Sequence, residues 1–570
     1  MSRAPLTFPL VLGLLSGLHL AHARVGEPFF NNDESRHVMT GVFFRDVYVD
    51  GPVWTLRDYT SGYYLQYPAL GLLIWPPLFH ALEGFVMLIC GDQLLTAKLL
   101  IGAFAALACW YLFLFVRRTH TLATAALTVL LFGLSPMVFQ FSEHVMLEIP
   151  MLAFVLAALY HINLYLDNSR WRDLAPGCAF TAAAALTRFD GIVLAPCFAL
   201  LIACKGRWDV LGRRAVWLGA ALAVLATLPY YALAGMEIAS VHTRTVQQGQ
   251  GDAPGHFLGS RNFLFYPSVV PEQVGVFLVA PAVLGLALAL RRSQRTATAP
   301  YLALTGATYL TFTPLAELEP RHAFPWIPAL SLFAADGLLA IGRFVHNRAT
   351  RWFARPGPQK RVPGTPMPLA TLVLAGVAVT GTGWLACHVP AVYVIGYEEA
   401  AAYVVDNNRA TPVCLFDSYL NGNFIYQVRR HDPDRRLWVL RGDKIFYTTL
   451  VDTLTEYREL APSEEAILAL IFKYDPEYLV LEELHPPAEV ENRFNVPMTN
   501  VLRQVIRAHP ERFTLAKTIE LESNHVAFRH GRLHVYHNLL RNPNPASQLD
   551  IDMIGLGRSI RTSIPRPGTP

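Results

Sequence analysis

The sequence predicts an α-helical polytopic membrane protein, with about eleven transmembrane helices and an interfacial helix, that ends in a soluble α/β domain. Hydrophobic residues make up 53% of the 570 residues and charged residues only 16%, whereas a soluble domain carries about 25% charged residues. Repeated apolar runs approach the ~20 residues that a helix needs to cross a bilayer. The net charge of +4 is small, and we expect no nucleic-acid partner.

The first apolar run, residues 5–23, follows Arg3 and ends in Ala-His-Ala. We expect a retained membrane helix, but the small-x-small ending also fits a signal-peptide cleavage site. With either interpretation, the chain after Arg24 starts outside the cytoplasm.

Basic residues orient the spans, because Lys and Arg concentrate in cytoplasmic loops. The other apolar runs lie at about 94–116, 121–139, 150–166, 175–187, 189–204, 215–235, 274–290, 300–316, 323–342 and 368–388. Basic clusters such as Arg117-Arg118 follow every second segment. This pattern predicts eleven spans, with the N-terminus inside and the C-terminal domain outside.

One more apolar run, residues 67–90, breaks this alternation if it is counted as a span. It contains Pro76-Pro77, which removes two backbone donors and kinks a helix. We interpret it as a helix lying in the outer interface. The alternative is an ordinary kinked span with the charge bias broken once.

The C-terminal part alternates short strand and helix patterns. The predicted strands are "PVCLFDS", "RLWVLRG", "EYLVLEE" and "RLHVYHN", and the predicted helices are "EEAAAYVVDNN", "SEEAILALIFKY" and "NVLRQVIRAHP". We place a membrane core at residues 1–345, a basic cytoplasmic loop with the last span at 346–390, the α/β domain at 391–545 and a disordered tail at 546–570. The chain has no Walker or dinucleotide fingerprint, so nothing supports ATP-driven transport.

Polar groups gather in the segments that this topology places outside. They are Asp33, Glu34, Glu148, Arg188, Asp190, His242, Arg261, Tyr266, Arg321 and His322. Charges at membrane depth are costly and mostly persist where they pair or bind something. A cavity with such groups can hold a lipid phosphate with arginine forks while a carboxylate takes a proton from an acceptor.

The order of the motifs resembles that of the polytopic type C glycosyltransferases that use polyprenyl-phosphate sugars. These are the family 39 protein O-mannosyltransferases and the lipid A aminoarabinose transferases. The matching elements are Asp33-Glu34 after the first span, "WPPLFHAL", "MLEIP", "LTRFDG" and "RHAFPWIP". The resemblance covers about residues 1–345 and is carried by the order and the topology.

The resemblance implies a role for each outer residue. Asp33, with Glu34 beside it, would act as base toward an acceptor, and the sugar would transfer with inversion in a single displacement. The ligands of the donor phosphate would be Arg188, Arg261 and Arg321. Further candidates for the substrate site are Glu148, Asp190, His242, Tyr266 and His322.

The sequence departs from the family pattern at three of these positions. Arg188 stands where many relatives have Lys, Glu148 where many have Asp, and His322 where Tyr is more usual. These changes keep the class but leave the donor sugar open. Some relatives hold a divalent metal near the site, whereas no close His/Asp/Glu spacing here predicts one.

Simpler interpretations stay open for the same residues. Asp33 and Glu34 could charge the first turn of an amphipathic helix from Arg36 to Asp46, and Glu148 could be a helix-start carboxylate. Arg188 and Asp190 could neutralise each other, and Arg321 could snorkel to the interface. His242 and His256 could be ordinary loop histidines and not metal ligands.

We therefore expect a mannosyltransferase-like enzyme of a bacterial inner membrane, with the α/β domain extracytoplasmic. Its expected partners are a polyprenyl-phosphate sugar, the bilayer, and a lipid, glycan or protein acceptor. The alternatives are a secondary transporter or lipid flippase, and a scaffold that displays the α/β domain. The sequence names neither the sugar nor the acceptor.

Overall fold

The computed structural model describes residues 7–23, 32–72, 74–248, 260–291, 295–315, 318–353, 369–448, 457–488, 490, 494, 496–553 and 558–564. These residues form two compact units. Unit 1 comprises Met1–Ala23, Lys98–Tyr231 and Asp252–Ala391. Unit 2 comprises Arg24–Ala97, Ala232–Gly251 and Val392–Pro570.

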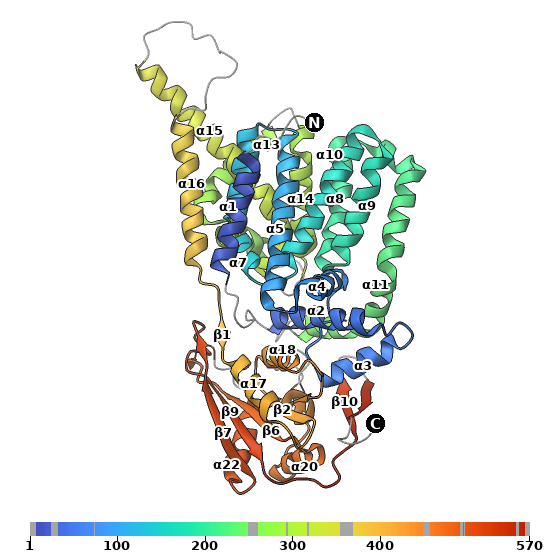
Figure 1. The fold of residues 1–570 in the computed structure, drawn as a ribbon. Coiled ribbons are helices and arrows are strands. Elements are labelled where there is room, and N and C mark those ends of the chain that lie inside the picture. The colour runs from blue at the N-terminus through green and yellow to red at the C-terminus, as the bar shows by residue number, and fades with distance from the viewer. Residues whose placement is uncertain are drawn as a thin grey trace. The chain divides into compact units, whose positions relative to one another are not determined.

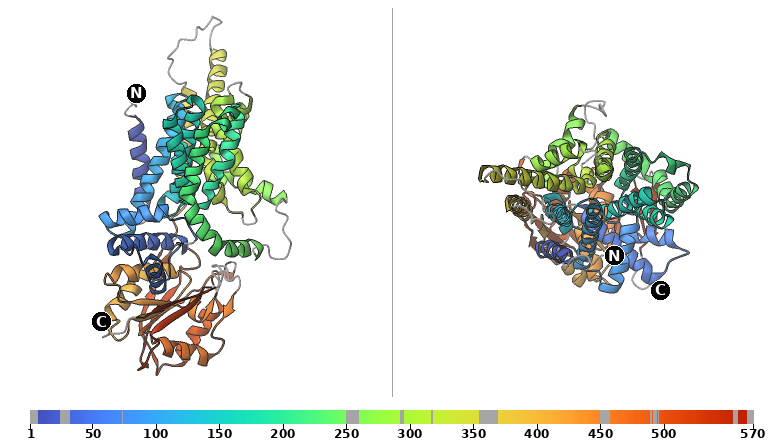
Figure 2. Two further views of the ribbon diagram at one scale, coloured as in Figure 1. Left: turned by 90° about the vertical axis from the view of Figure 1, so that its right-hand side faces the viewer. Right: turned by 90° about the horizontal axis from the view of Figure 1, so that it is seen from above.

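Unit 1 is a helical bundle, and most of its helices run side by side (Figures 1 and 2). Its elements are α1 (Thr7–His22), α5 (Leu94–Arg117), α6 (Leu122–Gly133), α7 (Pro136–Glu143), α8 (Glu148–Asn168), α9 (Trp171–Ala185), η1 (Phe189–Val193), α10 (Leu194–Lys205), η2 (Trp208–Gly212), α11 (Arg214–Gln248), α12 (Ser260–Val274), α13 (Val276–Arg291), α14 (Arg295–Phe312), η3 (Pro320–Trp326), α15 (Ile327–Phe353) and α16 (Leu369–His388). The start of α5 and the end of α11 belong to unit 2.

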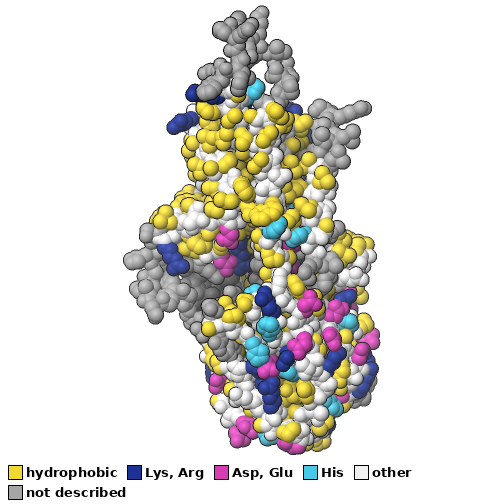
Figure 3. Space-filling view, turned by 90° about the vertical axis from the view of Figure 1, so that its left-hand side faces the viewer, with side chains coloured by type: hydrophobic (Ala, Val, Ile, Leu, Met, Phe, Trp, Pro, Cys, Tyr) yellow, Lys and Arg dark blue, Asp and Glu magenta, His cyan; other side chains and the backbone are white. Residues whose placement is uncertain are grey.

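Every apolar run predicted as a span falls on one of these helices or on a pair of them. Among the described residues, 5 helices are long and apolar enough to cross a membrane, or 6 if the pair α6 and α7, bent by 60°, is one span. The total of eleven transmembrane spans therefore stays a prediction. The surface of unit 1 in Figure 3 is largely hydrophobic, and α16 exposes Leu372, Val373, Val377 and Trp384. Exposed apolar side chains on such a helix suit contact with lipid.

Two glycines let α13 and α15 touch along their backbones. A Cβ added at Gly285 would lie 1.8 Å from Phe333 O, and one at Gly337 would lie 2.0 Å from Pro281 O. Small residues of this kind allow membrane helices to approach closely.

The helix α1 is part of the packing of unit 1. His19 Nε2 is 2.8 Å from the carbonyl oxygen of Gly133, and Leu15 is buried against the same helix, α6. These contacts suit a retained helix, and cleavage after residue 23 stays untested.

Unit 2 is built on a mixed sheet of five strands in the order β3-β2-β6-β9-β7. The strands β2, β3 and β6 are parallel, and β9 is antiparallel to both β6 and β7. The elements of unit 2 are α2 (Asn32–Asp50), α3 (Leu56–Gln66), α4 (Leu78–Cys90), β1 (Val394–Ile395), α17 (Tyr397–Asn407), β2 (Val413–Asp417), α18 (Asn421–His431), β3 (Trp438–Arg441), α19 (Gly442–Ile445), β4 (Tyr447–Thr448), β5 (Arg458–Glu459), α20 (Glu464–Tyr474), β6 (Tyr478–Glu483), α22 (Pro497–Ala508), β7 (Phe513–Glu520), β8 (Glu522–Ser523), β9 (Arg532–Asn538), β10 (Gln548–Met553) and β11 (Arg558–Ser563).

Helices cover both faces of this sheet (Figure 1). Leu415 and Leu479 face a core that includes side chains of α20 and α22. On the other face, the ring of Phe416 stacks on Phe424 of α18 at 4.1 Å between centroids and contacts Tyr397 of α17. The alternation follows from the strand period of two, which turns successive side chains to opposite faces.

All seven strands and helices predicted in the C-terminal part are confirmed at β2, β3, β6, β9, α17, α20 and α22. The sequence prediction missed β7 and α18. Most of the β7 side chains are exposed, so that strand lacks a strong apolar pattern. The helix α18 begins with "NGN", which is typical of a turn.

The disorder predicted for residues 546–570 is wrong for 548–553 and 558–563. These residues form the antiparallel pair β10–β11. Leu549 and Ile551, together with the adjacent Ile564, lie in the same core as α20 and α22. Three apolar side chains among polar ones are therefore enough to order the segment, because the core supplies their partner.

The grouping of the chain also differs from the predicted domains. Residues 24–97, which we predicted as part of the membrane core, group with the α/β domain. Leu65 of α3 is buried in the core of that domain, and Gln66 Nε2 donates to the carbonyl oxygens of Arg435 and Leu437 at 2.6 and 3.0 Å.

The run 67–90 forms a helix only at its end. Residues 67–72 and 74–77 are irregular around Pro76-Pro77, and α4 has 13 residues. A straight helix of that length rises about 20 Å, which is less than the ~30 Å of a hydrocarbon core. The length suits an interfacial helix, and its position relative to a membrane stays a prediction.

Candidate functional site

Five charged side chains of unit 1 meet where helices begin. We call this group the ion cluster: Glu148, Arg188, Asp190, Glu319 and Arg321. Arg188 Nη1 lies 2.8 Å from Glu148 Oε1, and Arg188 Nε lies 2.5 Å from Asp190 Oδ2. Arg321 Nη1 lies 4.0 Å from the same oxygen of Glu148, and Arg321 Nε donates to Glu319. The structure thus brings together four predicted site residues from three separate motifs.

Breaks between helices put these side chains in place. Glu148 is the first residue of α8, and Arg188 is the extended residue between α9 and η1. Pro320 starts η3, so that Arg321 follows directly. The hydroxyl of Tyr231 donates to the carbonyl oxygen of Ala185 at 2.8 Å and ties α11 to the end of α9. The motif "LTRFDG" therefore lies where α9 ends and the segment leading to α10 begins, as the sequence indicated.

Glu148 lies at the centre of the ion cluster. Its exposed fraction is 0%, and among the described residues neither of its oxygens accepts a hydrogen bond. The 2.8 Å approach of Arg188 is therefore an ionic contact without hydrogen-bond geometry. A buried carboxylate with unfilled acceptor sites is costly unless another donor reaches it.

The ion cluster holds three carboxylates and two guanidinium groups. Arg188 is paired with Asp190 and Glu148, as the simpler interpretation of mutual neutralisation expects. Planar guanidinium groups are also common partners of phosphate oxygens, to which they can donate two parallel N–H bonds.

Tyr266 lies close to the ion cluster. Burial, and then the charges of Asp190 and Glu319, raise the pKa of the Tyr266 hydroxyl above its usual range. This hydroxyl is buried, and it has no hydrogen-bond partner among the described residues. It is therefore available to a bound ligand.

A glutamine that sequence reasoning missed holds η3 against α12. Gln273 Nε2 donates to the carbonyl oxygen of Pro320, and its Oε1 accepts from Trp326 Nε1, both at 2.7 Å. Gln273 is fully buried. A polar residue directly before the apolar run 274–290 is the signal that could have found it.

The other predicted residues of unit 1 have varied positions. His322 is half-buried, and its ring stacks on Phe312 at 5.9 Å. Arg261 is exposed at the start of α12, and the ion pairs of the described residues do not include it. The side chain of His242 lies outside the described residues, as does the whole of His256.

Unit 2 carries Asp33 and Glu34 in the first turn of α2. The predicted helix began at Arg36, whereas α2 begins at Asn32, so both carboxylates are helical residues. Asp33 is half-buried and Glu34 is fully buried. Carboxylates at a helix N-terminus interact favourably with its dipole, so the first-turn interpretation holds for their position. It does not exclude chemistry by Asp33.

The start of α2 is tied to the α/β domain. Asn32 Nδ2 donates to the carbonyl oxygen of Tyr419 at 2.8 Å, and Gly422 of α18 packs against the side chain of Ser35. Asp33 therefore lies on a helix end that the loop after β2 and the helix α18 hold in position.

The described residues contain no group of three or more His, Cys, Asp or Glu side chains that could hold a metal ion. The ion cluster supplies acids interleaved with arginines, which is not a metal donor set.

Comparisons with known proteins add to this geometry. Residues 75–233 match the family model described as dolichyl-phosphate-mannose-protein mannosyltransferase. The crystal structure of ArnT from Cupriavidus metallidurans bound to undecaprenyl phosphate is similar, with a TM-score of 0.57 and 14% identity over 94% of this chain and 99% of that one.

A second similar structure is the archaeal oligosaccharyltransferase AglB from Archaeoglobus fulgidus, in complex with an inhibitory peptide and a dolichol-phosphate. Its TM-score is 0.53 at 12% identity, over 83% of this chain and 69% of that one. A search of curated protein sequences found no match. At such identities the likeness establishes the fold.

Proposed function

Because the chain has the fold of the type C glycosyltransferases, as the order of its motifs predicted, we propose that it is an inverting glycosyltransferase. It moves a sugar from a polyprenyl-phosphate donor to an acceptor at the extracytoplasmic face of a bacterial inner membrane. The observation that carries the proposal is the similarity, along nearly the whole of both chains, to an enzyme bound to undecaprenyl phosphate. The matched family model favours mannose as the sugar.

The ion cluster binds the donor phosphate in this proposal. Arg188 and Arg321 hold the phosphate oxygens, because a planar guanidinium can offer two parallel N–H groups. Arg261 is exposed, and it contributes its charge to the approach of the donor. The hydroxyl of Tyr266 donates to the donor, and Glu148 keeps the two arginines in position between turnovers.

Asp33 acts as the base. The acceptor oxygen or nitrogen attacks the anomeric carbon as the Asp33 carboxylate takes its proton, and Glu34 orients the acceptor. The bond between the anomeric carbon and the phosphate oxygen breaks, and the polyprenyl phosphate leaves with the electron pair. One displacement inverts the configuration, and the lipid-linked donor supplies the energy.

The test measures release of polyprenyl phosphate from a polyprenyl-phosphate mannose donor by the full-length protein in lipid vesicles. Replacing Asp33 by Asn should lower turnover by roughly 10²–10⁴-fold, the usual worth of a general base. The matched control is Asp58→Asn, because Asp58 is an exposed carboxylate in the first turn of α3. Equal turnover of Asp33→Asn and the wild type would exclude Asp33 as the base, and no transfer by the wild type with any polyprenyl-linked sugar would exclude the enzyme.

A further inference from the structure

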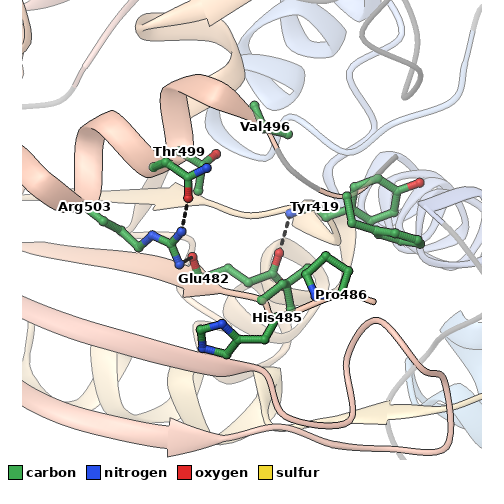
Figure 4. Close-up of a pocket in the computed structure, with 10 residues that line it drawn as sticks. Tyr419, Glu482, His485, Pro486, Val496, Thr499 and Arg503 are labelled. Carbon is green, nitrogen blue, oxygen red and sulfur yellow. Dashed lines mark hydrogen bonds between the residues drawn. The ribbon is translucent and has the colours of Figure 1, made fainter. Parts of the chain in front are cut away.

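The α/β domain contains a cavity of about 350 Å³. Figure 4 shows that its lining comes from the end of β6, the loop after β2 and the helix α22. The residues that line the cavity include Tyr419, Glu482, Phe494, Thr499, Asn500 and Arg503. The volume lies at the lower end of the ~300–1,000 Å³ of small-molecule sites.

The cavity lies where strand connections diverge. The chain leaves β2 for β3 on one side and then returns to β6 on the other side of β2, and all three strands are parallel. The carboxyl ends of β2 and β6 therefore border a topological switch point. Open α/β sheets bind their ligands in the crevice outside these strand ends.

Hydrogen-bonding groups of several kinds converge on the cavity. Glu482 Oε2 accepts from the backbone N–H of Tyr419 at 2.8 Å (Figure 4). The hydroxyl of Tyr397 donates to the other oxygen of Glu482. Arg503 Nη1 donates to the carbonyl oxygen of Glu482 at 3.2 Å, and Nη2 donates to the side chain of Asn500. A carboxylate, a guanidinium and an amide are thus held in fixed orientations.

The charges around the cavity are mixed. Among the described lining residues, Arg503 supplies a guanidinium and Glu482 a carboxylate, and Glu483 lies 3.8 Å from Arg503 and 3.0 Å from Arg507. Burial raises the pKa of Glu482 to about 7, so its charge varies near neutral pH. A neutral ligand with many hydroxyl groups would find both donors and acceptors here.

One wall of the cavity is aromatic. The rings of Tyr419 and Phe494 lie 4.7 Å apart between centroids, and both contact Phe528. Aromatic walls next to convergent polar groups suit a ligand with one apolar face and hydroxyl groups on its rim. A sugar ring has this form.

We propose that this cavity binds a short neutral saccharide. On the function proposed above, this saccharide is part of the acceptor, and its site lies in the unit that also carries Asp33. Glu482 and Asn500 bond the sugar hydroxyls, Arg503 orients the side chain of Asn500, and the aromatic wall packs against the apolar face of the ring.

The experiment measures binding to the full-length protein in detergent, without donor, by saturation-transfer NMR. The probes are the methyl glycosides of mannose, glucose, galactose and N-acetylglucosamine, with inorganic phosphate as the anionic probe. We expect saturable binding of at least one glycoside, weakened ~10-fold or more by Asn500→Ala, since the hydrogen bond to a sugar hydroxyl is lost. Phe494→Ala should weaken it similarly by removing the wall.

The matched control is Phe472→Ala, because Phe472 is an exposed ring of α20 that does not line the cavity. Binding of no glycoside, binding of phosphate alone, or equal binding by all variants would overturn the proposal. The binding needs no donor, so it is independent of the transferase test. Glycoside binding by a protein that transfers no sugar would keep the saccharide site and remove only its assignment to the acceptor.

Discussion

Two buried carboxylates, one in each unit, have very different surroundings. Asp46 of unit 2 accepts five hydrogen bonds, two from Arg45, two from Arg429 and one from the hydroxyl of Tyr63. Glu148 of unit 1 is equally buried, yet among the described residues it accepts none. The first site is complete without a ligand, and the second is not.

The difference indicates which site is structural. The pair Asp46–Arg429 joins residues 383 positions apart, and it connects α2 to α18. A buried ion pair with all its hydrogen bonds made holds two segments in register. In the ion cluster, Glu148 keeps both oxygens without a hydrogen bond among the described residues, which suits the ligand site proposed above.

Breaking the complete site should have the largest effect. Replacing Arg429 by Ala removes two charge-assisted hydrogen bonds from the buried Asp46, which keeps its bonds from Arg45; at about 1.5–3 kcal/mol for each bond, the cost is about 3–6 kcal/mol. We expect that loss in the free energy of unfolding of unit 2, measured by urea unfolding with protease protection. The control is Arg436→Ala, whose side chain is 60% exposed and should cost less than about 1 kcal/mol. A loss no larger than that of the control would contradict the structural role.

Two other buried carboxyls of unit 2, Asp417 and Glu482, predict a pH dependence. Burial raises the pKa of Asp417 to about 6, with Asp443 adding to the shift, and burial raises that of Glu482 to about 7, with Asp417 adding. The hydrogen bond from Tyr447 and the charge of Arg503 partly lower the pKa of Asp417. In the same way, the hydrogen bond from Tyr397 and the charge of Arg503 partly lower the pKa of Glu482.

Both folded pKa values lie above the unfolded ones, so the folded unit keeps protons that the unfolded chain releases. The free energy of unfolding should therefore fall as pH rises from about 4 to about 7, by at most ~3 kcal/mol for each group, and then level off. The measurement is the urea midpoint of unit 2 at pH 5 and pH 8. Glu482→Gln should remove about half of the difference, and an unchanged difference in that variant would contradict the assignment.

Opening the ion cluster should affect ligand binding more than stability. Arg188→Ala should weaken binding of polyprenyl phosphate by roughly 10–150-fold, the worth of a charge-assisted hydrogen bond. Arg188→Lys should recover only part of it, because Lys offers a point charge without a fork. The control is Arg213→Ala, which removes a surface pair with Asp209. Equal affinity of Arg188→Ala and this control would remove Arg188 from the donor site.

The smallest change is Tyr266→Phe. The hydroxyl has no protein partner among the described residues, so its loss should leave thermal stability unchanged and raise the donor KM about 3–10-fold. The control Tyr309→Phe loses a 2.9 Å bond to the carbonyl oxygen of Phe263 and should lower stability without changing KM. A stability loss with unchanged KM in Tyr266→Phe would make this hydroxyl structural.

Hydrophobic pattern was enough for most of the helices and for the buried strands, although it missed β7 and α18. The apolar runs predicted helices, and strands such as 413–417 and 478–483 followed from short buried runs, because burial requires a pattern that is visible in the sequence. The motif order also indicated the fold and selected Glu148, Arg188, Asp190 and Arg321, which meet in unit 1.

Long-range contacts decided the rest. The grouping of residues 24–97 with the C-terminal domain depends on partners such as Asp46 and Arg429. The sequence around either residue does not predict the other as its partner. Strands β10 and β11 are ordered by a core to which they contribute Leu549 and Ile551, although their own composition is typical of disorder. The saccharide cavity arises from the crossing of connections at β2 and β6. A sequence determines what each segment can bury, whereas only the packed chain determines against which partner it is buried.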